Sequence, residues 1–302
     1  MENIDYEEDN KILKNKYNED EDNNENYKSK YKKNNKIKYD KILEFTPEMI
    51  KERIKKSSFI FCASPRKSGK SYLIHHILYH LRHYFECGIV ISPTSLLGGG
   101  MFKFIPESYH YDLSPNSETF DEIIEKIINL QKMRVKNKKK MKQILLIMDD
   151  VFVSSRGGGR KNVGRTSYTL AKMASIGRHF SCFMVAISQN IFNLTPAIRS
   201  QASFFISFYL RSFSAREMVV EQFLTREMSG SKKATRKKAE NVLEQIWGDD
   251  PEFKAVIVDL ENSKSNKITE NIFWIRAPPP PLPKFNIGCK ELKKKTEKKY
   301  ND

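Results

Sequence analysis

The chain has 302 residues and a formal net charge of +16, with 30% charged and 39% apolar residues. This length suits one large α/β core with tails, and the positive charge favours an anionic partner such as nucleic acid. No run approaches the roughly 20 apolar residues of a membrane-spanning helix, and the acidic start does not resemble a signal peptide. The four cysteines are widely spaced, which excludes a paired-cysteine zinc or redox motif.

The first 40 residues differ in composition from the rest of the chain. They are rich in Asn, Asp, Glu, Lys and Tyr, and they show almost no apolar periodicity. Such a segment cannot bury enough surface to offset the entropy lost on ordering, so we predict a disordered tail over 1–40. A single domain is predicted over 41–283, and a basic tail over 284–302.

Apolar runs that alternate with amphipathic segments indicate an α/β domain. The predicted strands lie at 59–63, 88–92, 143–148, 181–188, 204–210, 255–260 and 271–275. The predicted helices lie at 47–55, 71–85, 121–133, 166–179, 215–224 and 234–247, and residues 94–115 are predicted to form a loop. Strands that are apolar throughout and alternate with helices are typical of a mainly parallel sheet flanked by helices on both faces.

A glycine- and lysine-containing loop follows the first predicted strand and leads into a helix. In such a loop, backbone N–H groups and the positive end of the helix bind phosphate. Lys70 is expected to reach the β- and γ-phosphates, and Ser71 to bind Mg²⁺. The alternative is a basic turn without a ligand, because Ser64 replaces the usual first glycine. The predicted nucleotide-binding residues are Ser64, Pro65, Arg66, Lys67, Ser68, Gly69, Lys70 and Ser71.

Polar side chains follow two later strands. The run 144–148 ends at Asp149 and Asp150, and the strand over 183–188 ends at Gln189. Asp149 is expected to bind Mg²⁺, and Asp150 to orient or deprotonate the attacking water. Gln189 is expected to contact the γ-phosphate or that water, the alternative being an ordinary turn amide. The sequence therefore predicts a site that binds ATP with Mg²⁺ and hydrolyses it.

Three segments in this order, SPRKSGKS, LLIMDD and GRHFSCFMVAISQ, resemble the poxvirus-type genome-packaging ATPases of large DNA viruses and virophages. These enzymes belong to the FtsK–HerA superfamily of P-loop DNA pumps, and the resemblance spans about Ser58 to Leu210. It implies a RecA-like P-loop NTPase fold of the ASCE type and ATP-driven translocation of double-stranded DNA into a capsid. It also implies a homo-oligomeric ring, viral capsid proteins as partners, and a location in the host cytoplasm or nucleus at sites of virion assembly, or in the virion.

The resemblance also implies roles for single residues. Lys70 and Ser71 match the Walker A pair, and Asp149 matches the Walker B aspartate that binds Mg²⁺. Asp150 stands where the wider superfamily often has glutamate. The remaining catalytic residues implied by the resemblance are Gln189, as a sensor amide, and Arg178, as the arginine that reaches the γ-phosphate of a neighbouring subunit. The alternative for Arg178 is a surface arginine at a helix C-terminus, where its charge is favourable.

A loop rich in glycine and arginine follows the acidic pair. Its cationic residues, grouped around three consecutive glycines, are Arg156, Arg160, Lys161 and Arg165. In a ring such a loop is predicted to grip DNA phosphates without reading bases, the alternative being a solvent loop. The basic segment 232–238 is a second candidate contact or a solvated face. The proline run 278–283 is either a strap across the core or a ligand for a partner.

Two other function classes stay open at this point. The first is another P-loop DNA pump or a helicase. The second is a nucleotide-gated DNA-binding or assembly protein without efficient turnover. A small-molecule kinase is disfavoured, because nothing in the sequence resembles a lid or an acceptor pocket.

Overall fold

The computed structural model describes residues 41–93, 101–111, 118–151, 169–225, 230–262 and 268–288. The predicted N-terminal tail and most of the predicted C-terminal tail lie outside these residues. The same is true of the predicted DNA-gripping loop with Arg156, Arg160, Lys161 and Arg165.

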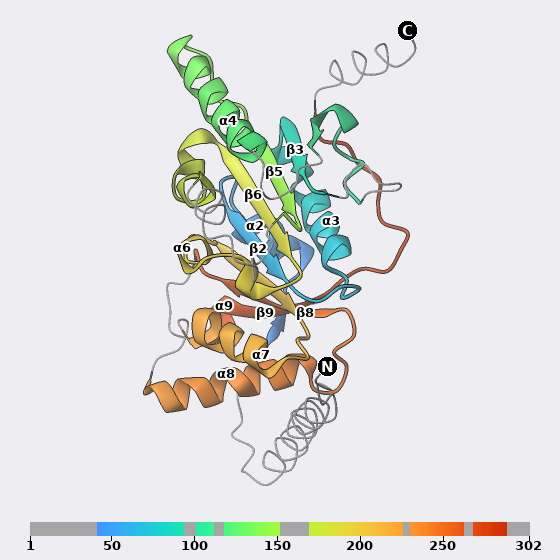
Figure 1. Ribbon diagram of the computed structural model, residues 1–302. Helices are drawn as coiled ribbons and strands as arrows, with labels where there is room; N and C mark the ends of the chain where they lie inside the picture. Colours follow the sequence, from blue (N-terminus) through green and yellow to red (C-terminus); the bar gives the residue numbers. More distant parts are fainter. Residues whose placement is uncertain are drawn as a thin grey trace, which may run out of the picture. The chain divides into compact units, whose positions relative to one another are not determined.

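The described part of the chain is built around one sheet (Figure 1). The order of its nine strands is β1-β9-β8-β7-β2-β6-β5-β3-β4. The strands are β1 (Leu43–Glu44), β2 (Phe59–Ala63), β3 (Cys87–Ile91), β4 (His110–Tyr111), β5 (Ile144–Asp149), β6 (Cys182–Ser188), β7 (Phe204–Phe208), β8 (Lys254–Asp259) and β9 (Ile272–Arg276). The strand β6 separates β2, which leads into the predicted phosphate loop, from β5, which ends at the acidic pair.

One strand of this sheet runs against the others. Among the described strands, β8 pairs antiparallel with both β7 and β9, whereas every other neighbouring pair is parallel. The predicted mainly parallel α/β fold, with helices beside the sheet, is therefore confirmed. The reversal of β8 also has a consequence for the site. It places the start of β8 at the same edge of the sheet as the ends of the parallel strands.

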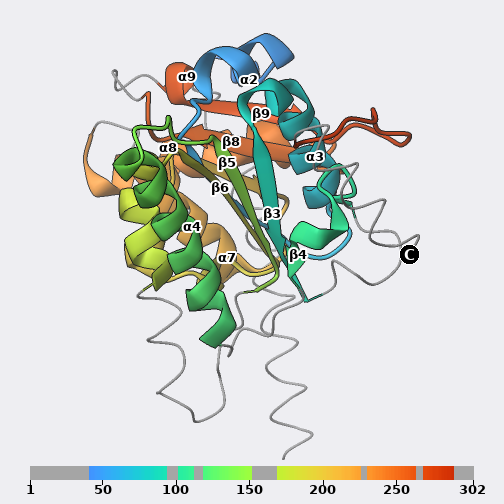
Figure 2. The ribbon, with the colours of Figure 1, turned by 90° about the horizontal axis from the view of Figure 1, so that it is seen from above.

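The helices cover both faces of the sheet, as predicted. The described helices are α2 (Pro47–Arg53), α3 (Lys70–Leu81), α4 (Glu118–Lys136), α6 (Pro196–Arg199), α7 (Phe213–Val219), α8 (Lys232–Trp247) and α9 (Ile268–Asn271), with further helical residues at 169–176. Figure 2 shows α2 and α3 on one side of the strands, and α4, α7 and α8 on the other. Thr46 caps α2 by accepting a hydrogen bond from the Met49 N–H.

Successive side chains of the central strands point to opposite faces of the sheet and pack into two separate hydrophobic cores. Phe61 of β2 packs with the apolar face of α4 and α8, whereas its neighbour Ile60 packs with α2 and α3. Every residue of β2, β6 and β7 is buried. This two-sided burial explains why these strands are apolar throughout. Cys62 and Cys182 are free thiols buried in β2 and β6.

Short elements differ from the sequence prediction. The predicted loop over 94–115 contains, in its described part, the 3₁₀ turn η2 (Glu107–Tyr109) and the edge strand β4, which pairs with β3. The helix predicted over 215–224 begins as α7 and continues as the π-helix η5 (Val220–Leu224). Further 3₁₀ turns are η1 (Arg82–Tyr84), η3 (Gly177–Phe180) and η4 (Ile191–Asn193). Two-residue strands and single turns carry too few residues for a periodic signal.

Packing continues beyond the predicted domain end at residue 283. The Phe285 ring stacks on Phe104 with 4.3 Å between ring centroids, and the Ile287 N–H donates to the Phe104 carbonyl at 2.7 Å. Ile287 is also buried. The ordered segment that lies on the core therefore reaches Ile287.

Candidate nucleotide site

The predicted site residues from three strands meet at one edge of the sheet. In the strand register, Ala63 of β2 lies opposite Ser188 of β6, and Asp149 of β5 lies opposite Ile187 of β6. Because β6 runs between β2 and β5, Gln189 lies between the loop that follows β2 and the acidic pair. The carboxyl ends of parallel strands are the usual place for a ligand in an open α/β sheet.

The backbone of the loop requires glycine at Gly69. This residue has φ of 99° and precedes the first residue of α3. A Cβ built on Gly69 would lie 3.0 Å from the Ala277 Cβ and 3.2 Å from the Phe253 Cδ1. Both the left-handed conformation and the lack of space therefore exclude a side chain at this position. The loop presents the N-terminus of α3, where an anion is stabilised.

The Lys70 side chain folds back over the loop. Lys70 is 8% exposed, and its ammonium group donates to the carbonyl oxygens of Ser64 at 2.7 Å and Pro65 at 2.6 Å. Burial lowers the pKa of Lys70, while Cys62 and the nearby Asp150 act in the opposite direction. Lys70 is thus a buried cation within the loop that is predicted to bind phosphates.

The Ser64 side chain has a structural role. Its hydroxyl accepts a hydrogen bond from the Phe208 N–H at 2.7 Å and donates to the Ala63 carbonyl at 2.5 Å, and Ser64 is fully buried. It therefore ties the start of the loop to the end of β7. This explains why serine stands where the family pattern has glycine: its hydroxyl satisfies a buried backbone donor.

We expect Ser64→Ala to lower the free energy of unfolding by about 1–3 kcal/mol, because the buried Phe208 N–H would lose its acceptor. Chemical denaturation followed by circular dichroism measures the change. Ser200→Ala is the matched control, since the Ser200 hydroxyl is exposed and donates within its own turn. Equal stabilities of the Ser64 and Ser200 variants would contradict this role.

The acidic pair lies next to Lys70 at the end of β5. Burial, and then the neighbouring Asp150, raise the pKa of Asp149 to about 7, while Lys70 acts in the opposite direction. Asp150 has φ of 51°, and its N–H donates to the Ile187 carbonyl at 3.0 Å. Because the two carboxyl groups are adjacent and Asp149 is mostly buried, ionising both of them is unfavourable unless a cation is bound nearby.

The oxygen donors of this edge fit Mg²⁺. The Ser71 hydroxyl lies on the first turn of α3, and the Ser68 hydroxyl is buried without a hydrogen-bond partner among the described residues. Together with the Asp149 carboxylate, Ser71 supplies the hard oxygen ligands that Mg²⁺ prefers, with water and phosphate oxygens completing the set. The assignment of Ser71 and Asp149 as ligands stays a prediction.

Gln189 links the acidic pair to the loop. Its Nε2 donates to the Asp150 Oδ2 at 2.5 Å, and its Oε1 accepts from the Arg66 Nε at 2.7 Å. The sequence predicts Gln189 at the site but not its contact with Arg66, since 123 positions separate the two residues and no motif joins them. The amide therefore orients Asp150 and is itself oriented by Arg66.

Arg178 lies away from this cluster. It belongs to η3, which precedes β6, and it is exposed. A seven-residue strand spans about 20 Å, so Arg178 lies near the opposite edge of the sheet from Gln189. The fold therefore does not bring Arg178 to the site of its own chain, and its role toward a neighbouring subunit stays a prediction.

The basic segment 232–238 forms the first half of α8. Within it, Arg236 pairs with Glu217, with Glu240 at 3.2 Å and with Glu221 at 3.8 Å. Arg236 is therefore already paired with carboxylates of its own chain and is less available to bind DNA phosphates. The lysines of this segment remain candidate DNA contacts.

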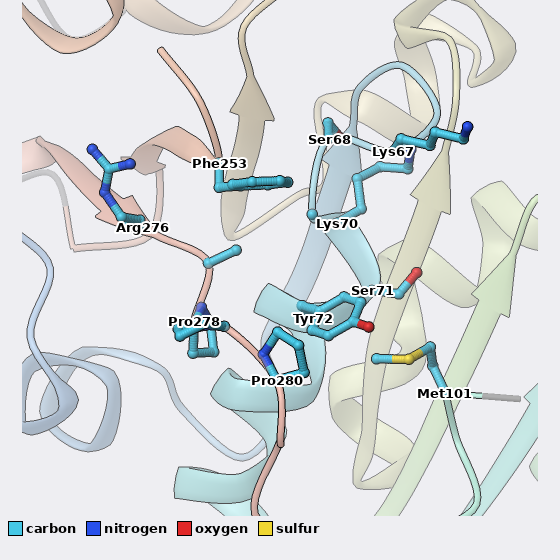
Figure 3. A pocket seen from close by; sticks show the side chains of 13 residues that line it. Lys67, Ser68, Lys70, Ser71, Tyr72, Met101, Phe253, Arg276, Pro278 and Pro280 are labelled. Atoms are coloured by element: carbon cyan, nitrogen blue, oxygen red, sulfur yellow. The ribbon is translucent and has the colours of Figure 1, made fainter. Parts of the chain in front are cut away.

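The sequence analysis missed one wall of the site. A cavity of about 650 Å³ adjoins the loop, and residues from the turn before β8 and from the segment after β9 line it (Figure 3). The first three prolines of the proline run border this cavity, and whether the run acts as a strap or as a ligand for a partner stays a prediction. Its proline composition was the available signal, whereas nothing near Phe253 marks it in the sequence.

None of the helices in the described ranges combines the length and the apolar character that crossing a membrane requires.

The chain is similar in sequence to proteins of two viruses. It is 28% identical over 251 residues to the uncharacterized protein L437 of Acanthamoeba polyphaga mimivirus, covering 80% of this chain and 79% of L437. It is 24% identical over 213 residues to the uncharacterized protein 015R of Frog virus 3, covering 70% of this chain and 59% of 015R. No protein-family model matches the chain.

Comparison with known structures finds proteins of two kinds that were solved with bound nucleotide analogues. The genome-packaging NTPase B204 of Sulfolobus turreted icosahedral virus 2, in complex with ATP-γS, has a TM-score of 0.49 at 19% identity, covering 75% of this chain and all of B204. The pCW3 conjugation coupling protein TcpA, with ATPγS, has a TM-score of 0.49 at 13% identity, covering 73% of this chain and 60% of TcpA. B204 is a viral genome-packaging NTPase, the kind of protein that the three sequence segments resemble.

Proposed function

We propose that this chain is an ATPase that translocates double-stranded DNA and packages a viral genome into its capsid. The observation that carries the proposal is the contact chain from Arg66 through Gln189 to Asp150, beside the buried Lys70. It connects the phosphate loop to the predicted water-activating carboxylate. A bound γ-phosphate would lie among these groups, so its binding or release would change the contacts that each of them makes.

The chemistry of hydrolysis follows from the residues at this edge. Lys70 exchanges its two carbonyl partners for the β- and γ-phosphates and stabilises their charge. Ser71 and Asp149 would hold Mg²⁺, which neutralises negative charge that develops on the phosphate oxygens. Asp150 accepts the hydrogen bond or the proton of the attacking water, and Gln189 keeps the Asp150 carboxylate oriented.

The same proposal includes partners and a location. The exposed position of Arg178, remote from its own site, suits a homo-oligomeric ring in which it reaches the γ-phosphate bound by the next subunit. Double-stranded DNA would pass through the ring, gripped by Arg156, Arg160, Lys161 and Arg165. Capsid proteins are the proposed docking partners. Sites of virion assembly in the host cytoplasm or nucleus, or the virion itself, are the proposed location.

The decisive experiment measures phosphate release with and without long duplex DNA, for the wild-type chain and for Lys70→Ala. We expect hydrolysis to require Lys70 and to rise when duplex DNA is added. Lys51→Ala, an exposed lysine on α2, is the matched control and should behave as wild type. Hydrolysis that ignores DNA, or that survives the loss of Lys70, would contradict the proposal.

A charge-reversed loop, Arg156→Glu with Arg160→Glu, separates DNA gripping from hydrolysis in the same assay. We expect the DNA-stimulated rate to fall while the basal rate stays near that of the wild type. If both rates are unchanged, the loop is not a DNA grip. ATP binding without turnover would instead support a nucleotide-gated assembly protein, and strand separation of a forked duplex would support a helicase.

A further inference from the structure

The cavity beside the phosphate loop is lined by segments that are far apart in the sequence. They are the loop with the first turn of α3, up to Tyr72, then Met101, the turn before β8 with Phe253, and the segment 276–280 at and after the end of β9. Figure 3 shows Phe253, Tyr72, Pro278 and Pro280 around one space, with Ser71 beside Tyr72. Aromatic rings and proline rings therefore form part of its walls.

The wall opposite α3 is held in place by hydrogen bonds. The Arg276 guanidinium donates to the Glu252 carbonyl at 2.7 Å and to the Asp250 carboxylate at 2.5 Å. The Ala277 N–H donates to the Phe253 carbonyl at 2.8 Å. These bonds fix the turn before β8 to the end of β9.

Phe253 itself has an unusual conformation. Its φ of 55° lies in the left-handed region, which an aromatic residue rarely adopts, and its side chain is 44% exposed. A strained backbone that keeps a large apolar ring at the rim of a cavity is typical of a ligand site rather than of core packing. The fixed turn is what maintains this conformation.

The cavity and the phosphate loop share a wall. Phe253 and Ala277 lie so close to Gly69 that no Cβ fits between them. Tyr72 directly follows Ser71, the predicted Mg²⁺ ligand, on α3. A nucleotide whose phosphates bind at the N-terminus of α3 can therefore extend its sugar and base into this cavity.

We propose that the cavity binds the ribose and purine base of the nucleotide, with the base packed against the ring of Phe253 and flanked by Tyr72 and Pro278. This inference rests on the proposed function. The volume lies within the range of about 300–1,000 Å³ typical of small-molecule sites. Flat apolar walls select a flat aromatic ring by stacking. Because stacking does not read the polar edge of a base, ATP and GTP should bind with similar affinity.

The test compares two ligands, ATP and inorganic tripolyphosphate, by calorimetric titration of the full chain with Mg²⁺. Tripolyphosphate carries the phosphates without base or sugar. We expect Phe253→Ala to weaken ATP binding about tenfold or more, since base stacking is lost, and to leave tripolyphosphate binding within about twofold. Phe253→Tyr keeps the ring and should keep the ATP affinity, which guards against a folding defect.

Phe192→Ala is the matched control, because Phe192 is 43% exposed on η4 and lies outside the cavity lining. It should change neither affinity. If Phe253→Ala lowers the affinities for ATP and tripolyphosphate equally, or lowers neither, the proposed base pocket is wrong. The proposed Lys70-dependent binding of ATP would not be affected by that result. Wild-type chain that binds neither ligand would overturn the proposed function and the base pocket together.

Discussion

Replacing Asp150 with asparagine is expected to lower kcat for ATP hydrolysis by about 10²–10⁴-fold, the usual contribution of a positioned general base. Asparagine keeps the size of the side chain and an oxygen that can accept from the Gln189 amide, so ATP affinity should change little. The result would therefore isolate the carboxylate as a chemical group. Steady-state phosphate release at saturating ATP and Mg²⁺, together with a binding titration, measures both quantities.

Two further variants complete this test. Asp249→Asn is the matched control, because Asp249 is exposed and also belongs to a pair of adjacent aspartates, and it should leave kcat unchanged. Asp150→Glu supplies the residue found more often in the wider superfamily and tests whether the shorter side chain limits the rate. Full activity of Asp150→Asn would remove Asp150 from the chemistry.

Loss of the Asp259 side chain is expected to cost about 3 kcal/mol of the free energy of unfolding, because hydrogen bonds to a charged group contribute about 1.5–3 kcal/mol each and Asp259 accepts several. Asp259 is completely buried at the end of β8 and accepts from the Arg53 guanidinium at 3.1 Å. Its other carboxylate oxygen accepts from the N–H groups of Glu261 at 3.2 Å and Asn262 at 2.9 Å. Asp259→Ala would remove the acceptor that these donors share at the end of β8.

Urea denaturation of Asp259→Ala against wild type measures this loss. Asp259→Asn keeps the acceptor for the backbone N–H groups but removes the charge, so its loss should be smaller. Glu52→Ala, an exposed carboxylate on α2, should change stability by no more than about 0.5 kcal/mol. An Asp259→Ala protein as stable as wild type would show that this pair does not hold α2 to the sheet.

The sequence was informative wherever burial on both faces constrains a whole strand. The runs that became β2, β5 and β6 are apolar throughout because helices cover them on both sides. The direction of β8 was not predictable, since its run 254–259 reads like that of a parallel strand. Its orientation is set by what it pairs with, and pairing is a property of the whole fold.

The same contrast holds for the site. The meeting of Lys70, Asp149 and Gln189 at one edge of the sheet was predictable because each lies at or shortly after the end of an apolar strand. The role of Ser64 was not, because its partner, the Phe208 N–H, belongs to a distant strand. The contact of Arg66 with Gln189 and the position of Phe253 likewise depend on tertiary structure alone. Composition offered no hint of either.

The first and last described strands along the chain, β1 and β9, pair with each other, and this affects when the sheet can be completed during synthesis. β1 pairs with β9, and the Phe45 N–H donates to the Trp274 carbonyl at 2.7 Å. During translation the loop around Gly69 is synthesised early. Phe253 and Ala277, which pack against Gly69, are synthesised some 200 residues later. During synthesis the loop therefore stands without its outer wall until the end of β9 has emerged. Contacts of such long sequence separation also form slowly, so a newly made chain completes the walls of the candidate site only after β9 has been made.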